Sequence, residues 1–260
     1  MTFDPDTLDG VLDIAGPARV AVTRAIGRSP QLRLETAGAS TLILVCDDPD
    51  HEIPAQLDGI TAAAADRTWG VVGLKRSNGR TVLIFQDDVV RALRADRGDL
   101  LSVPAGSTTV NELATRLTRA RAVNVLLEPT RQTLTREFVR DDTTWSGLAV
   151  LAERTGRWRY SDGQQLVLAS PAWLLTQPVA ATVVENEDGY GPLDYDMHTN
   201  KALESAAASR VGPIPAMGTV HQIDVTGPAG GTWLVSSYAA DLGVGSGRTT
   251  WHRPTTSALG

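Results

Sequence analysis

The chain has 260 residues, of which 42% are hydrophobic, and this is enough for one large or two to three small globular domains. Twenty-four basic against 30 acidic residues give a net charge of -6 with no basic block, which excludes an electrostatic surface for nucleic acid or anionic membrane. The single cysteine, Cys46, lies in an apolar run and excludes an intrachain disulfide or a thiolate metal site. With no signal-peptide pattern and no apolar run near the ~18 residues of a membrane span, we expect a soluble, cytoplasmically folded chain.

The first 65 residues change from an irregular to a β-like pattern. Residues 1–18 are rich in Asp, Pro and Gly, a composition typical of an N-terminal arm. Strands are then expected at 19–26, 31–35 and 41–46, because turn-forming residues separate these runs. The Ala-rich segment 57–65 fits either a helix or a strand, and we favour a strand because an evident hairpin follows it.

The clearest hairpin signal of the chain comes next. Strands expected at 69–75 and 81–86 flank Asn78-Gly79, a pair that suits a turn with positive φ at both residues. Asp87 or Asp88 is then placed to cap a short helix. Six expected strands before residue 90 predict a small barrel or sandwich.

A new pattern begins after 101–107, a segment whose proline and glycine indicate a domain boundary. Thr108 or Thr109 can cap a helix, and strands are expected at 123–127 and 133–139. The apolar face of that helix comprises Val110, Leu113, Ala114 and Leu117.

The segment 133–169 predicts a strand, a helix and a hairpin in succession. The helix begins after Thr143 or Thr144 and ends at Gly156, which is free to adopt the left-handed backbone that closes helices. Two short strands follow around Asp162-Gly163. We therefore expect a β-α-β-β unit with one sheet face covered by one helix.

The last third reads as mainly β. Residues 170–197 are loop-like except for a strand at 181–184, and Asp196 is favoured as the cap of a helix at 199–209. Strands are then expected at 218–225, 232–240 and 249–253. The glycine-rich stretch Gly243–Gly247 lacks the Lys-Ser/Thr ending of a phosphate loop and is interpreted as a hairpin tip.

Two clusters combine carboxylates with an imidazole, both competent metal ligands. They are Asp47, Asp48, Asp50 and His51 in the first third and Asp194, Asp196 and His198 in the last. Asp beside Pro49 favours a turn for the first cluster, and a helix cap is favoured for the second. We therefore predict no metal site at either place.

Other candidate functional residues have simpler structural interpretations. Trp145, Trp158 and Tyr160 could stack on a sugar, yet such residues more often pack a helix onto its sheet. Arg97-Gly98-Asp99 spells an integrin-type tripeptide, which an exposed helix end explains better. No catalytic or cofactor-binding motif occurs, and the histidines are scattered at positions 51, 198, 221 and 252. We expect no enzyme activity, no catalytic residue and no cofactor.

Three stretches resemble one protein family in that family's order. The first stretch, at 38–50, is Gly-Ala-Ser-Thr-Leu-Ile-Leu followed by Asp-Pro-Asp. The second begins with Thr-Thr-Trp-Ser-Gly-Leu-Ala at 143–149 and continues to Tyr160. The third, at 226–254, is Thr-Gly-Pro-Ala-Gly-Gly-Thr-Trp-Leu-Val-Ser-Ser-Tyr with a later Trp-His-Arg-Pro. Together they resemble the hub proteins of bacteriophage tails, which contractile injection systems share. The resemblance covers about residues 19–253.

The sequence patterns and this resemblance together lead us to expect an α+β, mainly β fold with four parts: an arm at 1–18, a β-barrel-like domain at 19–103, a middle α+β domain at 104–178 and a second β-barrel-like domain at 179–260. The resemblance also implies a structural virion protein at the distal end of the tail, assembled in the host cytoplasm. Three copies would form a ring that ends the tail tube and surrounds the DNA channel. The implied partners are the tail tube or distal tail protein, tip, fibre or spike proteins and a tape measure protein.

Two other functional classes stay open from the sequence. A carbohydrate-binding or adhesion module would use Trp145, Trp158, Trp233 and Trp251, and an unrecognised hydrolase would assemble its site only on folding.

Overall fold

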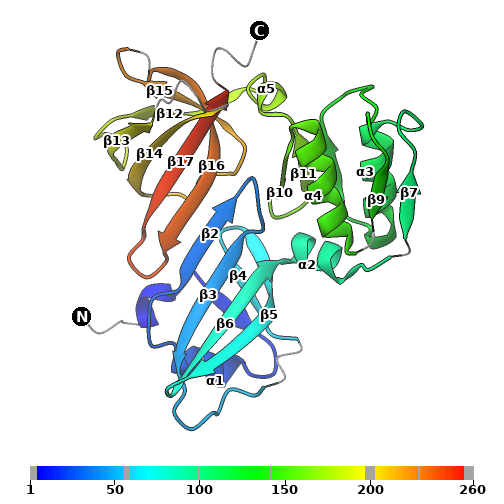
Figure 1. The fold of residues 1–260 in the computed structure, drawn as a ribbon. Coiled ribbons are helices and arrows are strands. Elements are labelled where there is room, and N and C mark those ends of the chain that lie inside the picture. Colours follow the sequence, from blue (N-terminus) through cyan, green and yellow to red (C-terminus); the bar gives the residue numbers. More distant parts are fainter. Residues whose placement is uncertain are drawn as a thin grey trace.

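The computed structural model describes residues 5–55, 59–98, 100–140, 142–196, 203–227 and 229–254, and over these the protein is mainly β. Figure 1 shows three groups of elements, which we call the N-terminal β unit, the helical unit and the C-terminal β unit. The N-terminal β unit comprises η1 (Pro5–Leu8), β1 (Asp13–Ala15), α1 (Arg19–Ala25), β2 (Gln31–Glu35), β3 (Thr41–Asp47), β4 (Thr61–Ala64), β5 (Arg67–Ser77), β6 (Arg80–Asp87) and α2 (Asp88–Ala95).

The other two units follow in chain order. The helical unit comprises β7 (Leu101–Val103), α3 (Val110–Thr118), η2 (Arg119–Arg121), β8 (Val125–Leu127), β9 (Phe138–Arg140), α4 (Thr144–Thr155), β10 (Trp158–Ser161) and β11 (Leu166–Ala169). The C-terminal β unit comprises α5 (Pro171–Leu174), β12 (Val179–Val184), β13 (Tyr190–Asp196), β14 (Leu203–Val211), β15 (Val220–Asp224), β16 (Gly231–Asp241) and β17 (Ser246–Pro254).

A single curled sheet runs through both β units. Within the described residues it has twelve strands, in the order β1-β4-β5-β6-β3-β2-β16-β17-β14-β13, with β15 and β12 continuing from β16. The link is β2 against β16, where Leu34 lies opposite Tyr238 in an antiparallel register. The expected mainly β class is confirmed, whereas the boundaries predicted at 19–103, 104–178 and 179–260 stay predictions.

The long strand β16 pairs with two different strands along one of its edges. Its first half pairs with β15 and its second half with β2, and the register against β17 shifts between Val235 and Ser237. At this bulge the carbonyl oxygen of Ser236 accepts hydrogen bonds from both the backbone N–H and the hydroxyl of Thr36. The extra residue re-aims the strand, as bulges generally do.

Local signals predicted most turns and helix ends correctly. Asn78 and Gly79 have φ values of 50° and 70° and close the β5–β6 hairpin. Asp87 caps α2 by accepting from the Val90 backbone N–H at 3.0 Å. Thr109 caps α3 in a reciprocal capping box, and Gly156 closes α4 in the left-handed conformation.

The structure overturns two predictions in the first 26 residues. Residues 19–25 of this segment form helix α1 instead of a strand, and Val22 is buried while Val20 is 58% exposed, although a strand would place both on one face. The segment 5–18 is not an irregular arm, since β1 pairs with β4 and Ile14 is buried in the core. The ambiguous segment 57–65 contains strand β4, while its first two residues lie outside the described ranges.

The expected β-α-β-β unit is also corrected. Only the end of 133–139 forms a strand, β9, and this pairs with β7 in a separate two-stranded sheet. The hairpin of β10 and β11 instead takes β8 as its third strand, in parallel with β11. Both α3 and α4 pack in this unit, so the sheet is not covered by one helix alone.

The largest error lies in the last third. The helix predicted at 199–209 is strand β14 from Leu203 onward, held between β13 and β17, and residues 197–202 lie outside the described ranges. The segment 185–197, expected as a loop, contains β13. The remaining predicted strands of this third match β12, β15, β16 and β17, and Gly243–Gly247 joins β16 to β17. Over the described ranges, the helices are too short or too polar to cross a membrane.

Candidate functional site

The β10–β11 hairpin lies between two hydrophobic cores. All eight of its strand residues are buried, and successive residues point to opposite faces. Tyr160 and Val167 pack into the core shared by the β units, whereas Leu166 and Leu168 pack into the core of α3 and α4. The hairpin therefore joins the helical unit to both β units.

A buried ion pair fastens this hairpin to the N-terminal β unit. Arg67 on β5 donates from Nη1 to Asp87 Oδ2 at 3.0 Å and to the Ser161 carbonyl oxygen at 2.9 Å. Burial lowers the pKa of Arg67, although the neighbouring Asp87 carboxylate favours its charged form. A side-chain atom at Gly163 would meet Arg67 Cγ at 2.7 Å, so the turn has no room for a larger residue there.

Aromatic contacts fasten the same hairpin to the C-terminal β unit. The Trp158 ring lies edge-on to His252 with centroids 6.4 Å apart. Gly218, before β15, lies so close to Tyr160 that a Cβ atom there would overlap the hydroxyl oxygen. Burial raises the pKa of Tyr160, so the phenol stays neutral in this contact.

The tryptophans proposed as a sugar platform are core residues. Trp145, Trp158, Trp233 and Trp251 are all at least nine-tenths buried. The buried guanidinium of Arg159 lies over the Trp145 ring, with its Cζ atom 3.8 Å from the ring centroid. Burial lowers the pKa of Arg159 to about 10. None of the four rings presents a face to solvent on which a sugar could stack.

The histidines do not assemble a catalytic triad in the part of the chain that is described. His221 is buried and accepts a hydrogen bond at Nδ1 from Trp251 Nε1 at 3.2 Å. Burial, and then the positive charge of Arg210, lowers the pKa of His221 to about 4. His51 is exposed in a loop, and His252 packs against Trp158.

The two carboxylate clusters take structural roles where they are described. Asp48 is buried and accepts from the Thr81 hydroxyl at 2.7 Å and from the Ile53 backbone N–H, so it shapes the turn after β3. Asp194 pairs with Arg248 at 2.7 Å. His198 lies outside the described residues, and within them no three His, Cys, Asp or Glu side chains gather closely enough to hold a metal ion.

Sequence reasoning missed the residues that join the units. Asp87 was identified only as a helix cap, and nothing in the local pattern marked Arg67, whose partners lie 20 and 94 residues away. Of the Arg97-Gly98-Asp99 tripeptide, Arg97 is exposed after α2 and Asp99 lies outside the described ranges.

No protein-family model matches the chain, and no curated protein sequence matches it. Solved structures do. The 43 kDa tail protein of prophage MuSo2 from Shewanella oneidensis has a TM-score of 0.62 at 11% identity, covering 94% of this chain and 96% of that one. The tail protein from Neisseria meningitidis MC58 has a TM-score of 0.61 at 11% identity, covering 95% and 97%. The chain has the fold of phage tail proteins.

The tail-protein fold also occurs outside phages. The E. coli c3393 protein has a TM-score of 0.64 at 12% identity, covering 95% of this chain and 77% of its own. It is described as a component of the type VI secretion system with structural similarity to the T4 bacteriophage tail proteins gp27 and gp5. The predicted resemblance to tail proteins is thus confirmed at the level of the fold.

Proposed function

We propose that this chain is a structural virion protein of the phage tail tip. Three copies form a hub ring that ends the tail tube and attaches tip, fibre or spike proteins. The observation that carries this proposal is the likeness to two phage tail proteins over nearly the whole length of both chains. The two β units joined by one sheet support it further, because three chains with two β units each can match a six-fold tube.

The charge distribution supports a role in lining the DNA channel. Residues 1–103 carry 15 acidic and 11 basic residues, and residues 179–260 carry 8 acidic and 4 basic residues. The segment between them, 104–178, carries 7 acidic and 9 basic residues. Acidic β units facing the channel would repel phosphates and let DNA slide through without binding.

The proposed role is mechanical and uses no cofactor. The partners are further copies of the chain, the tail tube or distal tail protein, tip proteins and a tape measure protein, assembled in the host cytoplasm. Burial of the tryptophan rings removes the support for a carbohydrate-binding module.

Immunogold electron microscopy of intact particles tests this proposal. Antibody raised against the chain should label the distal end of the tail alone. Label along the fibres, on the capsid or on no particle would contradict it. Antibody to a capsid protein on the same grids is the control for accessible antigen.

A further inference from the structure

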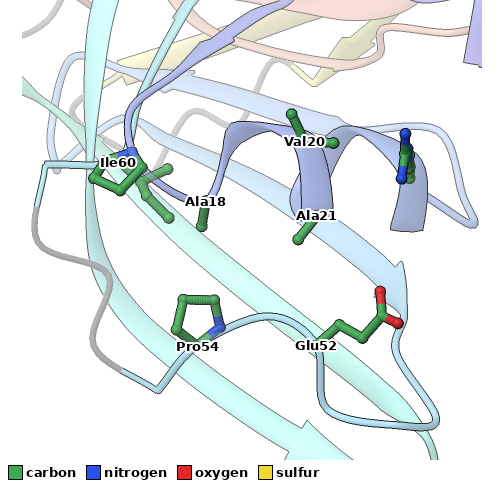
Figure 2. Close-up of a pocket in the computed structure, with 8 residues that line it drawn as sticks. Ala18, Val20, Ala21, Glu52, Pro54 and Ile60 are labelled. Carbon is green, nitrogen blue, oxygen red and sulfur yellow. The ribbon is translucent and has the colours of Figure 1, made fainter.

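An open groove of about 440 Å³ lies beside α1 in the N-terminal β unit. Figure 2 shows Ala18 and Ala21 pointing from the helix toward the loop that carries Pro54 and Glu52, with Ile60 at the opposite end from Glu52. Val20 on the outer side of the helix has a relative exposure of 58%. The groove therefore offers apolar walls and an exposed apolar rim to a side chain from outside.

The end of this groove near Glu52 is acidic. Asp47, Asp50 and Glu52 are exposed there, together with Arg24. Asp47 pairs with Arg80 at 3.2 Å, while Asp50 and Glu52 have no ion-pair partner among the described residues. A ligand that suits the groove has an apolar side chain with a basic group next to it.

A second surface of the same chain has this chemistry. We call it the basic corner: Leu100 with Arg94, Arg97, Arg119 and Arg121. Leu100 is the most exposed large hydrophobic residue described, at 72%. Arg121 lies 3.6 Å from Asp96, which brings η2 against the loop after α2.

Among the described residues, the basic corner combines four guanidinium groups with one nearby carboxylate, that of Asp96. Hydrogen bonds from the Thr144 hydroxyl and then the Gly98 backbone N–H, followed by the nearby guanidinium groups of Arg121 and Arg140, lower the pKa of Asp96 against the opposing effect of burial. Within the described ranges, the corner residues Arg94, Arg97 and Arg119 have no ion-pair partner. An acidic surface on another molecule can supply one.

The two surfaces cannot meet within one chain. The groove is beside α1 at the far end of the N-terminal β unit, whereas the corner is where α2 leads into the helical unit (Figure 1). Two complementary patches at different places on one molecule can form a head-to-tail contact between copies, and such contacts build a ring when the rotation from one copy to the next closes.

We infer that the basic corner of one subunit docks into the α1 groove of the next, with Leu100 between the apolar walls and Arg97 facing Glu52. This inference rests on the proposed ring and names the contact that closes it. Opposite charges at the contact set its register and salt dependence, and the buried leucine supplies its apolar centre.

Charge reversal tests the contact in the full chain. Sedimentation velocity of wild type should show a concentration-dependent oligomer. Glu52→Arg and Arg97→Glu should each weaken self-association by about tenfold, and the double variant should return to within about threefold of wild type, because it restores opposite charges. The matched control is Glu153→Arg on the exposed face of α4, which should leave association unchanged.

A disulfide between subunits tests the register. Cys46 is fully buried, and burial raises its pKa to about 12. We therefore expect only the engineered cysteines to form disulfides. The double variant Val20→Cys/Leu100→Cys should form covalent dimers and trimers on mild oxidation, whereas Val20→Cys/Glu153→Cys should not.

The outcomes separate this inference from the proposed function. A monomeric wild type, unchanged association of both single variants, or no covalent ladder would overturn the docking contact. Immunogold labelling of particles would still test the proposed position of the protein at the tail tip, independently of this contact. If Glu52→Arg blocked incorporation into particles without weakening self-association, the groove would belong to a different tail protein, and the inference would again be wrong.

Discussion

Arg67 and Asp87 form a buried ion pair, with side-chain exposures of 4% and 0%, in which the carboxylate has a second role. Asp87 Oδ2 accepts from the guanidinium while Oδ1 accepts from the Val90 backbone N–H and caps α2. Because Arg67 also binds the Ser161 carbonyl, one pair connects β5, α2 and the β10–β11 hairpin.

Asp87→Ala should therefore be strongly destabilising. It leaves a buried guanidinium without its counter-charge, which costs about 3–5 kcal/mol, and removes a helix cap worth about 1 kcal/mol. Urea unfolding measures the loss. The control is Asp88→Ala, the adjacent half-buried residue that pairs with Arg91, for which we expect less than about 0.5 kcal/mol. Similar losses for both variants would contradict the prediction.

Stability should fall between neutral pH and pH 4. The pKa of His221 is about 4 in the folded chain, below its ordinary value of 6.5, so the unfolded chain binds a proton first as pH falls. Stability is full above pH 6.5 and decreases toward pH 4, by on the order of 3 kcal/mol. Urea unfolding at a series of pH values measures this slope.

The variant His221→Gln should flatten this slope, because glutamine does not titrate. Some slope should persist, since burial also lowers the pKa of His252. A variant whose stability falls with pH as steeply as that of wild type would show that His221 is not the responsible group.

Gly218→Ala should destabilise the contact between the hairpin and the C-terminal β unit. Gly218 has a φ of 72°, and its missing side chain leaves space for the Tyr160 hydroxyl. Gly106 has nearly the same φ, 69°, with nothing within 4 Å, so Gly106→Ala isolates the backbone cost of about 1 kcal/mol. Thermal unfolding should show a further loss of about 1–3 kcal/mol for Gly218→Ala. Equal losses would mean that the overlap relaxes without cost.

Trp233→Ala should reduce stability without affecting glycan binding. Trp233 is fully buried under the Arg253 guanidinium, which lies 4.2 Å from its ring, and we expect a loss of about 3–5 kcal/mol. The partly buried Trp173 on α5 is the control and should cost less when replaced by alanine. A glycan array with folded wild-type protein should show no binding, and a reproducible positive signal would favour an adhesion module.

Local patterns predicted the elements whose signals are local. The Asn78-Gly79 turn, the Thr109 capping box and the Gly156 helix end each depend on residues within about four positions of one another. The same holds for the β16–β17 hairpin. These elements could be predicted because their signals are confined to a few neighbouring residues.

The errors arose where tertiary contacts outweighed local preference. In α1 the order Arg-Val-Ala-Val alternates like a strand, yet Val20 is exposed and only Val22 enters the core. In β14 the run of three alanines favours a helix, but pairing on both sides imposes a strand, and Ala206 and Ala208 are small enough to pack under the aromatic core. Arg67 and Asp87 could not be paired from sequence, because the fold alone brings them together.

The pairing of β2 with β16 cannot form until late in translation, because the two strands are far apart in the sequence. Thr36 and Ser236, joined by hydrogen bonds at this seam, are 200 residues apart. Translation proceeds at about 5–20 residues per second, so β2 has an unpaired edge for roughly 10–40 seconds before β16 is made. Distant pairings of this kind slow folding and expose strand edges to aggregation. We therefore expect the need for chaperones during expression to depend on the β2–β16 pairing more than on any single hairpin.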